Sequence, residues 1–121
     1  LFLKIQYNGA KAMAELAEFD PTNLVVGILG GGAGTTRDTF ELIEQANRFG
    51  ARVALFGRKI YKAEDSIEIV KLMRRIVESD LSPKGAVKLY HDSLEKKTIS
   101  PSRSLEDDLE ITDSTLIAEA K

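Results

Sequence analysis

Short apolar segments and longer amphipathic stretches alternate along the first hundred residues of the chain. The apolar segments are LFLKIQY (1–7), LVVGIL (24–29) and ARVALFG (51–57). Their near-continuous apolarity is typical of parallel strands that are covered on both faces. Between and after them, apolar residues recur at helical spacing over 10–19, 36–49, 65–79 and from Ser82-Pro83 to residue 96. This β-α-β-α-β-α-α order predicts parallel strands joined by right-handed crossovers.

The second helix has the clearest boundary signals. Thr35 and Asp38 have the spacing of a capping box, and Gly50 stands where a left-handed C-terminal residue is expected. In the third helix we expect the core-facing stripe to comprise Ile67, Val70, Met73 and Val77.

Two α/β architectures fit this order: a doubly wound sheet, or part of a (β/α)₈ barrel. Because such barrels run to about 250 residues, three strands would be less than half of one. The chain begins inside an apolar strand, so we expect an upstream part to be missing. We expect residues 98–121 to form a polar, acidic C-terminal extension with a weak helix near Leu116. Its acidic cluster predicts a solvated stretch rather than a metal site, because neither EF-hand spacing nor a histidine accompanies Asp107, Asp108, Glu110 and Asp113.

Composition narrows the functional classes. The 121 residues are 43% hydrophobic and 30% charged, with a net charge of −2, which is ordinary for a soluble globular protein. No broad basic surface for nucleic acid is indicated, and the longest apolar run is too short for a membrane span. The chain has no cysteine, which excludes disulfides and thiolate metal sites. These features predict a cytoplasmic protein without nucleic-acid or membrane partners.

The glycine-rich segment GILGGGAGTTRDTF (27–40) is the strongest candidate for chemistry. A strand, a glycine turn and a helix start together favour an anion, because bare backbone N–H groups and the helix dipole meet there. A P-loop is excluded because the segment has no lysine. The dinucleotide pattern G-x-G-x-x-G fails at Thr35, and only Gly30-x-Gly32-x-Gly34 remains. Arg58, after the third strand, fits a 2′-phosphate, so an NADP-type half-domain of an oxidoreductase stays open.

Gly57 and Arg58 end the third strand on the same edge of the sheet as the glycine segment. We expect the N–H groups from Gly30 to Gly32 and of Gly57 to hold phosphate oxygens, with Arg58 adding charge. The alternative is that these glycines serve tight turns and that Arg58 is a surface residue.

Lys4 is a candidate nucleophile within the first strand. Alternation places Lys4 on one face with Phe2 and Gln6, and Leu1, Leu3, Ile5 and Tyr7 on the other. A barrel would turn Lys4 inward, where loss of solvent lowers the pKa of the ammonium and yields a neutral amine that forms a Schiff base with a carbonyl. The alternative is a lysine that reaches out to solvent.

Four motifs together resemble the last three β/α units of the archaeal-type, DhnA-like class I fructose-bisphosphate aldolases. They are KIQYNG (4–9), GGG (30–32), GARVALFGRKI (50–60) and EDSIEIVKLMRRIV (64–77). The resemblance covers roughly residues 1 to 80. It implies that residues 1–97 form the C-terminal part of a (β/α)₈ TIM barrel, with strands six to eight and their helices.

The resemblance also implies a function. Lys4 matches the family's Schiff-base lysine, which would serve the reversible carbon–carbon cleavage of a phosphorylated ketose such as fructose 1,6-bisphosphate in glycolysis, with no metal or other cofactor. The implied phosphate-binding residues are Gly30, Gly31, Gly32, Gly57 and Arg58. Since the family's acid/base residues lie on earlier strands, we expect this chain alone to be an inactive part of a homo-oligomeric aldolase.

The chain departs from the family in the glycine segment. Leu29 or Gly30 stands where the family tends to have serine, and Gly32-Ala33 replaces a proline-lysine pair. Another phosphorylated ketose or aldose therefore remains open as the substrate, as does a barrel that binds a sugar phosphate without catalysis. We expect the single histidine, His91, to be a surface or packing residue.

Overall fold

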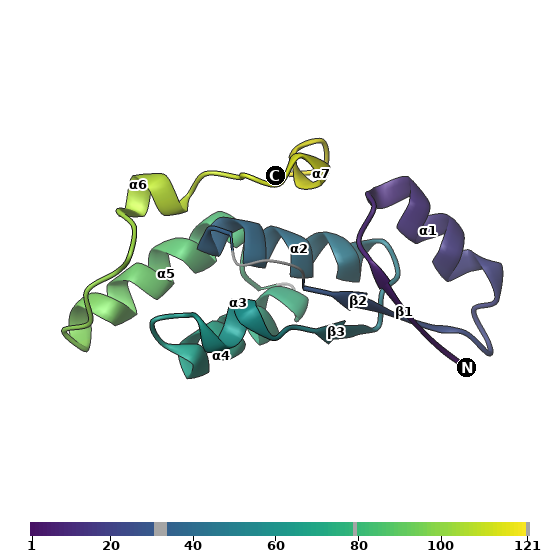
Figure 1. Ribbon diagram of the computed structural model, residues 1–121, viewed down its shortest axis with the longest axis horizontal. Coiled ribbons are helices and arrows are strands. Elements are labelled where there is room, and N and C mark those ends of the chain that lie inside the picture. The colour runs from purple at the N-terminus through teal and green to yellow at the C-terminus, as the bar shows by residue number, and fades with distance from the viewer. Residues whose placement is uncertain (31–33, 79, 121) are drawn as a thin grey trace.

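The computed structural model describes residues 1–30, 34–78 and 80–120. In this part of the chain three parallel strands form one open sheet, in the order β1 (Phe2–Gln6), β2 (Val25–Leu29) and β3 (Val53–Leu55) (Figure 1). The register places Lys4 beside Gly27 and Gly27 beside Val53. The prediction of three parallel strands is confirmed.

Seven helices are present in the described residues: α1 (Ala10–Phe19), α2 (Thr36–Arg48), α3 (Arg58–Tyr61), α4 (Ser66–Val77), α5 (Pro83–Lys96), α6 (Leu105–Asp108) and α7 (Ser114–Ile117). The four long helices lie where the sequence predicts them, and α7 is the weak helix expected near Leu116. The capping box of Thr35 and Asp38 is confirmed, and Gly50 has a φ of 109°, as a left-handed position after a helix requires. The short helices α3 and α6 were not predicted.

The prediction of a partial (β/α)₈ barrel is wrong. In a barrel each helix covers the strands, whereas here α4 and α5 pack against α2 and build a helical layer of their own. The sheet stays open, with β1 and β3 as its two edges. One sheet face is bare, and Phe2, Leu29 and Leu55 lie exposed on it. The chain is a small open α/β fold.

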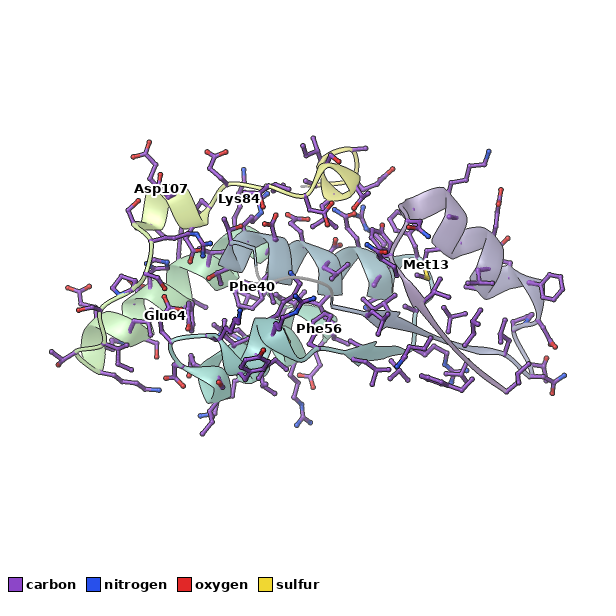
Figure 2. The ribbon with its side chains drawn as sticks, viewed as in Figure 1. Met13, Phe40, Phe56, Glu64, Lys84 and Asp107 are labelled. Carbon is purple, nitrogen blue, oxygen red and sulfur yellow. The ribbon has the colours of Figure 1, made fainter. Side chains whose placement is uncertain are left out.

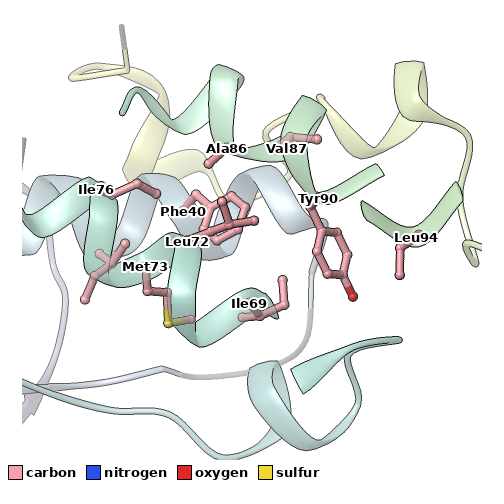
Figure 3. Close-up of a cluster of buried hydrophobic side chains, with 10 residues drawn as sticks. Phe40, Ile69, Leu72, Met73, Ile76, Ala86, Val87, Tyr90 and Leu94 are labelled. Atoms are coloured by element: carbon pink, nitrogen blue, oxygen red, sulfur yellow. The ribbon is translucent and has the colours of Figure 1, made fainter. Parts of the chain in front are cut away.

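Two hydrophobic clusters share α2 between them. In the first, Val26 and Ile28 of β2 pack with Leu42 of α2 and Met13 of α1. Figure 2 shows Met13 on α1. In the second, the opposite side of α2 meets α4 and α5 around Phe40 (Figure 3). A helix with two apolar sides needs two partners, which explains why α2 packs on the sheet with one side and on α4 and α5 with the other.

The core-facing stripe of α4 differs from the predicted one. The buried residues are Ile69, Leu72, Met73 and Ile76. Of the predicted stripe only Met73 is buried, whereas Ile67, Val70 and Val77 are exposed. Both stripes have helical spacing, and contact with α2 and α5 selects between them.

The C-terminal segment folds back along α2 (Figure 1). Asp108 is 2% exposed, so the expectation of a solvated acidic stretch is wrong at this position. Leu116 of α7 is 1% exposed and belongs to the core. His91 is a packing residue, with a side chain that is 10% exposed and lies against Asp108. The segment therefore contributes directly to the surroundings of the candidate site.

Candidate functional site

At the end of β2, the glycine segment makes a hydrogen bond and a close packing contact with β3 and the residue after it. The Gly30 N–H donates to the Leu55 carbonyl at 3.1 Å, as part of the pairing between β2 and β3. The ring of Phe56 packs so closely on Gly30 that a Cβ would not fit there. Gly30 thus has a structural role in the sheet, and its N–H is already used. Gly31 and Gly32, also predicted to bind phosphate, lie outside the described residues.

Carboxylates of the chain cap the first turn of α2. Asp38 Oδ2 accepts from the Thr35 N–H at 3.0 Å, and the Asp38 N–H donates to Thr35 Oγ1 at 3.1 Å. The Asp38 carboxylate also lies against Gly34, leaving no room for a Cβ. The Thr36 N–H donates to Asp108 Oδ1 at 2.7 Å. A helix start attracts anions, and here Asp38 and Asp108 meet that demand.

The C-terminal segment completes the bonding of Asp38. Asp38 Oδ1 accepts from the backbone N–H groups of Thr112 at 2.8 Å and Asp113 at 3.3 Å, and the Thr112 hydroxyl donates to Asp38 Oδ2. Burial alone would raise the pKa of the Asp38 carboxyl, but these bonds and the one from Thr35 favour the charged form, and the net pKa is lowered. Asp38 is therefore a buried, fully bonded anion that ties α2 to the C-terminal segment.

A second row of buried polar groups continues along α2. Arg37 Nε donates to Glu41 Oε1 at 2.9 Å, and Gln45 Nε2 donates to Glu41 Oε2 at 3.2 Å and to the Leu116 carbonyl at 2.8 Å. We call the ionisable groups of this side the paired cluster; it comprises Arg37, Asp38, Glu41, His91 and Asp108. Each of them lies against an ionisable partner or accepts a set of hydrogen bonds.

The other side of the first turn of α2 borders a basic cavity of about 90 Å³. Its cationic lining consists of Arg58, Lys59, Lys62 and Arg103. The first three come from α3 and the residue after it, and Arg103 comes from the segment before α6. Within residues 1–30, 34–78 and 80–120, none of these four cations has an ion-pair partner. Like charges around one small cavity repel one another, so an anion bound there would be stabilised.

Glu64 also lines the basic cavity, but its carboxylate is engaged elsewhere. It accepts from the Ser102 N–H at 2.9 Å, the Ser102 hydroxyl at 3.1 Å and the Tyr90 hydroxyl at 3.2 Å. Although burial acts to raise the pKa of Glu64, these bonds lower it overall. Glu64 therefore positions the chain next to Arg103, and it does not pair with the cavity's cations.

Lys59 differs from the other three cations because its side chain is half-buried. It lines the basic cavity and also a neighbouring cavity of about 300 Å³, beside Asp38 and Asp113. Loss of solvent lowers the pKa of the Lys59 ammonium, the charges of Asp38 and Asp113 partly offset this, and Arg58 lowers the pKa further. Its amine is thus more easily deprotonated than an ordinary lysine.

Lys4 lies on the bare face of the sheet, where its side chain is exposed. The predicted alternation of β1 is confirmed for Phe2, Lys4 and Gln6 on this face. The burial that a barrel would supply is missing. Lys4 shares the lining of an open cavity of about 570 Å³ with Gly57, whereas Arg58 lines the basic cavity. Of the predicted phosphate residues, Gly57 thus lines a cavity together with Lys4.

The sequence contains a partial signal for the basic cavity. Arg58 and Lys62 are four residues apart and Lys59 and Lys62 three apart, the spacings that place side chains on one helix face. Such a face was not predicted because α3 itself was not. Arg103 gives no local signal, because it reaches the cavity only through the fold of the C-terminal segment.

No protein-family model matches the chain, and no curated protein is significantly similar to it. In the described residues no helix is both long and apolar enough to cross a membrane. Nor do three His, Asp or Glu side chains gather within that part of the chain to hold a metal ion.

Proposed function

We propose that the chain binds the phosphate group of a phosphorylated small molecule in the basic cavity. One observation supports this proposal most directly. Four cations line the same cavity and have no ion-pair partners among the described residues: Arg58, Lys59, Lys62 and Arg103. Arginine and lysine are the usual phosphate-binding side chains. The helix start beside the cavity adds little to this attraction, because Asp38 and Asp108 already cap it.

The size of the cavity favours a single compact anion. Pockets for whole small molecules usually measure about 300–1,000 Å³, several times the roughly 90 Å³ found here. A phosphate group therefore fits the basic cavity, with the rest of the ligand outside it. A phosphorylated sugar suits this arrangement, in keeping with the resemblance to sugar-phosphate enzymes. A dinucleotide such as NADP is the alternative, since Arg58 follows β3 as a 2′-phosphate ligand would.

Calorimetric titration of the full chain tests the proposal. Inorganic phosphate, dihydroxyacetone phosphate and NADP are the three probes. We expect saturable binding of the first two, and a loss of at least about tenfold in affinity for Lys62→Gln, because a charge-assisted contact is worth about 1.5–3 kcal/mol. Lys11→Gln is the matched control, because Lys11 is an exposed lysine on α1. Equal binding by both variants would contradict the proposal, and binding of NADP alone would favour the dinucleotide.

Imine chemistry at Lys4 is a second candidate function, supported by the family resemblance. The observation that favours it is the open cavity that Lys4 shares with Gly57 at the carboxyl ends of the strands. The Lys4 amine would attack the ketone of a phosphorylated ketose and lose water. The resulting iminium would then stabilise the carbanion formed on carbon–carbon cleavage. Borohydride trapping with dihydroxyacetone phosphate, followed by peptide mapping, would place an adduct on Lys4 if this function is correct.

A further inference from the structure

The edge strand β3 is apolar along its whole length. Among the described residues β3 pairs only with β2, so no strand lies along its other side (Figure 1). Its three residues, Val53, Ala54 and Leu55, are all exposed, and none is charged. Edge strands usually carry a charge, a proline or a cover that prevents pairing with another chain. β1, at the opposite edge, has such a charge in Lys4, whereas β3 has none.

The exposed side of α4 extends this apolar edge. Val70 and Val77 lie two helical turns apart on α4 and are both exposed. Val70 lines the open cavity of about 570 Å³ together with Leu55, and Val77 lines a cavity of about 180 Å³ together with Val53. The strand edge and this side of α4 are therefore adjacent. We call them together the edge surface; it comprises Val53, Ala54, Leu55, Val70 and Val77.

The accessible surface of the chain is larger than its mass requires. A compact monomer of 13.3 kDa is expected to expose about 6,450 Å², whereas this chain exposes 7042 Å². The excess of about 600 Å² approaches the roughly 800 Å² that one partner buries in a standard interface. The excess area therefore suits one further chain docked on an exposed apolar surface such as the edge surface.

We propose that the edge surface is a dimer interface, in which a second copy of this chain pairs its β3 antiparallel to β3. A two-fold axis at Ala54 would set Val53 opposite Leu55 of the partner subunit. The two three-stranded sheets would then form one continuous sheet. The two copies of α4 would lie on either side of the same axis and cover each other's exposed valines. This inference does not depend on phosphate binding.

A second copy covers more of the edge surface than an unrelated strand does. A single extended peptide would pair with β3 but would leave Val70 and Val77 exposed. A second copy brings both a strand and a helix, and the antiparallel arrangement makes the same surface its own complement.

The charges that border the edge surface do not oppose this contact. Arg52, directly before β3, would lie opposite Phe56 of the partner subunit rather than opposite another cation. On α4, Arg74 is already paired with Glu78 at 3.0 Å, so this part of the helix carries a balanced charge. In β1, by contrast, the same antiparallel pairing about Lys4 would bring two ammonium groups together, which is unfavourable.

Sedimentation velocity of the full chain over about 5–500 µM tests the inference, because an interface slightly below standard size predicts a dissociation constant in the micromolar range. We expect the mass to rise from 13.3 kDa towards twice that value as the concentration increases. Leu55→Lys should raise the dissociation constant of the dimer at least about tenfold, because it buries a charge in an apolar contact. Leu89→Lys is the matched control: Leu89 is 38% exposed and Leu55 is 41% exposed, but Leu89 lies on α5, outside the edge surface. Circular dichroism checks that both variants are folded.

A cysteine introduced at the proposed axis tests the strand register. The chain has no cysteine of its own, and opposite residues of an antiparallel pair have Cα atoms about 4.5–5.5 Å apart, close enough for a disulfide. Under mild oxidation Ala54→Cys should form a covalent dimer at least about tenfold faster than Leu89→Cys does.

Three results would overturn the inference. The first is a wild-type chain that stays monomeric over the whole concentration range, which would leave the edge surface to a different partner. The second is a dimer that Leu55→Lys weakens no more than Leu89→Lys does. The third is equal cross-linking of the two cysteine variants, which would exclude the antiparallel pairing about Ala54.

Discussion

The charged groups on the two sides of the first turn of α2 differ in whether they have bonding partners within the protein. On one side, the carboxylates of the paired cluster are buried and bonded, as with Asp108, which accepts from the Thr36 N–H and lies against His91. On the other side, Arg58 and its neighbours in the basic cavity lack ion-pair partners among the described residues. Buried, matched charges bind the C-terminal segment to the fold, whereas unmatched cations remain available to a ligand. The difference implies that the first set governs stability and the second set governs binding.

Replacing Asp38 by alanine should have the largest effect. Asp38 is 2% exposed and accepts hydrogen bonds from Thr35, Thr112 and Asp113. Its removal leaves several donors unpaired, and each buried unpaired group costs about 1–3 kcal/mol. We expect the free energy of unfolding to fall by about 3 kcal/mol, measured by urea denaturation.

Asp107 is the matched control for this measurement. It lies in α6, within the C-terminal segment that bonds to Asp38, but its side chain points into solvent (Figure 2). Asp107→Ala should change the free energy of unfolding by less than about 0.5 kcal/mol. If the Asp38 and Asp107 variants were equally stable, the paired cluster would have no special role.

The capping of α2 shows how far the sequence reaches into this cluster. Thr35 and Asp38 are three residues apart, so a local rule predicts their reciprocal bonds. Nothing local predicts that Asp38 also accepts from Thr112, which is 74 residues away in the chain. The acidic segment around Asp108 has few apolar residues, and composition therefore favoured a solvated stretch.

Asp108→Ala should destabilise the protein less than Asp38→Ala does. Its carboxylate caps the Thr36 N–H at 2.7 Å and lies 2.8 Å from His91 Nε2. Loss of a helix cap costs about 1–2 kcal/mol, and we expect a decrease of about that size in urea denaturation. Because the vacated helix start would attract an anion, phosphate at about 20 mM should stabilise this variant more than it stabilises the wild type. An equal gain from phosphate in the two proteins would show that the vacated helix start binds no anion.

The dependence of the free energy of unfolding on pH tests whether Asp38 is charged in the folded protein. Because its pKa is lowered in the folded state, its contribution is present above the ordinary aspartate pKa of about 4 and is lost as pH falls below that value. Asp38→Asn lacks this contribution, so the difference in the free energy of unfolding between wild type and variant should shrink from neutral pH to below about pH 4. A difference that stays constant over this range would contradict a charged Asp38 in the fold.

The sheet and α4 show where sequence patterns stop being decisive. The strands and their alternation follow from local apolar spacing, and Lys4 lies on the predicted face. Whether those strands belong to a barrel or to an open sheet depends on where the later helices pack. The two candidate stripes of α4 overlap at Met73, and only contact with α2 and α5 buries Leu72 rather than Val70. Apolar periodicity predicts an amphipathic helix, but it does not predict which element the helix packs against.

Neutralising the basic cavity should have the smallest effect on stability and the clearest effect on binding. Lys62 is exposed and has no ion-pair partner among the described residues, so Lys62→Gln should change the free energy of unfolding by less than about 0.5 kcal/mol. In wild type, phosphate at about 100 times its dissociation constant should add about 2.7 kcal/mol. That gain should be markedly smaller in Lys62→Gln and unchanged in Lys11→Gln. If phosphate raised the free energy of unfolding equally in all three proteins, it would bind outside the basic cavity. The proposed difference between the two sides of α2 would then be wrong.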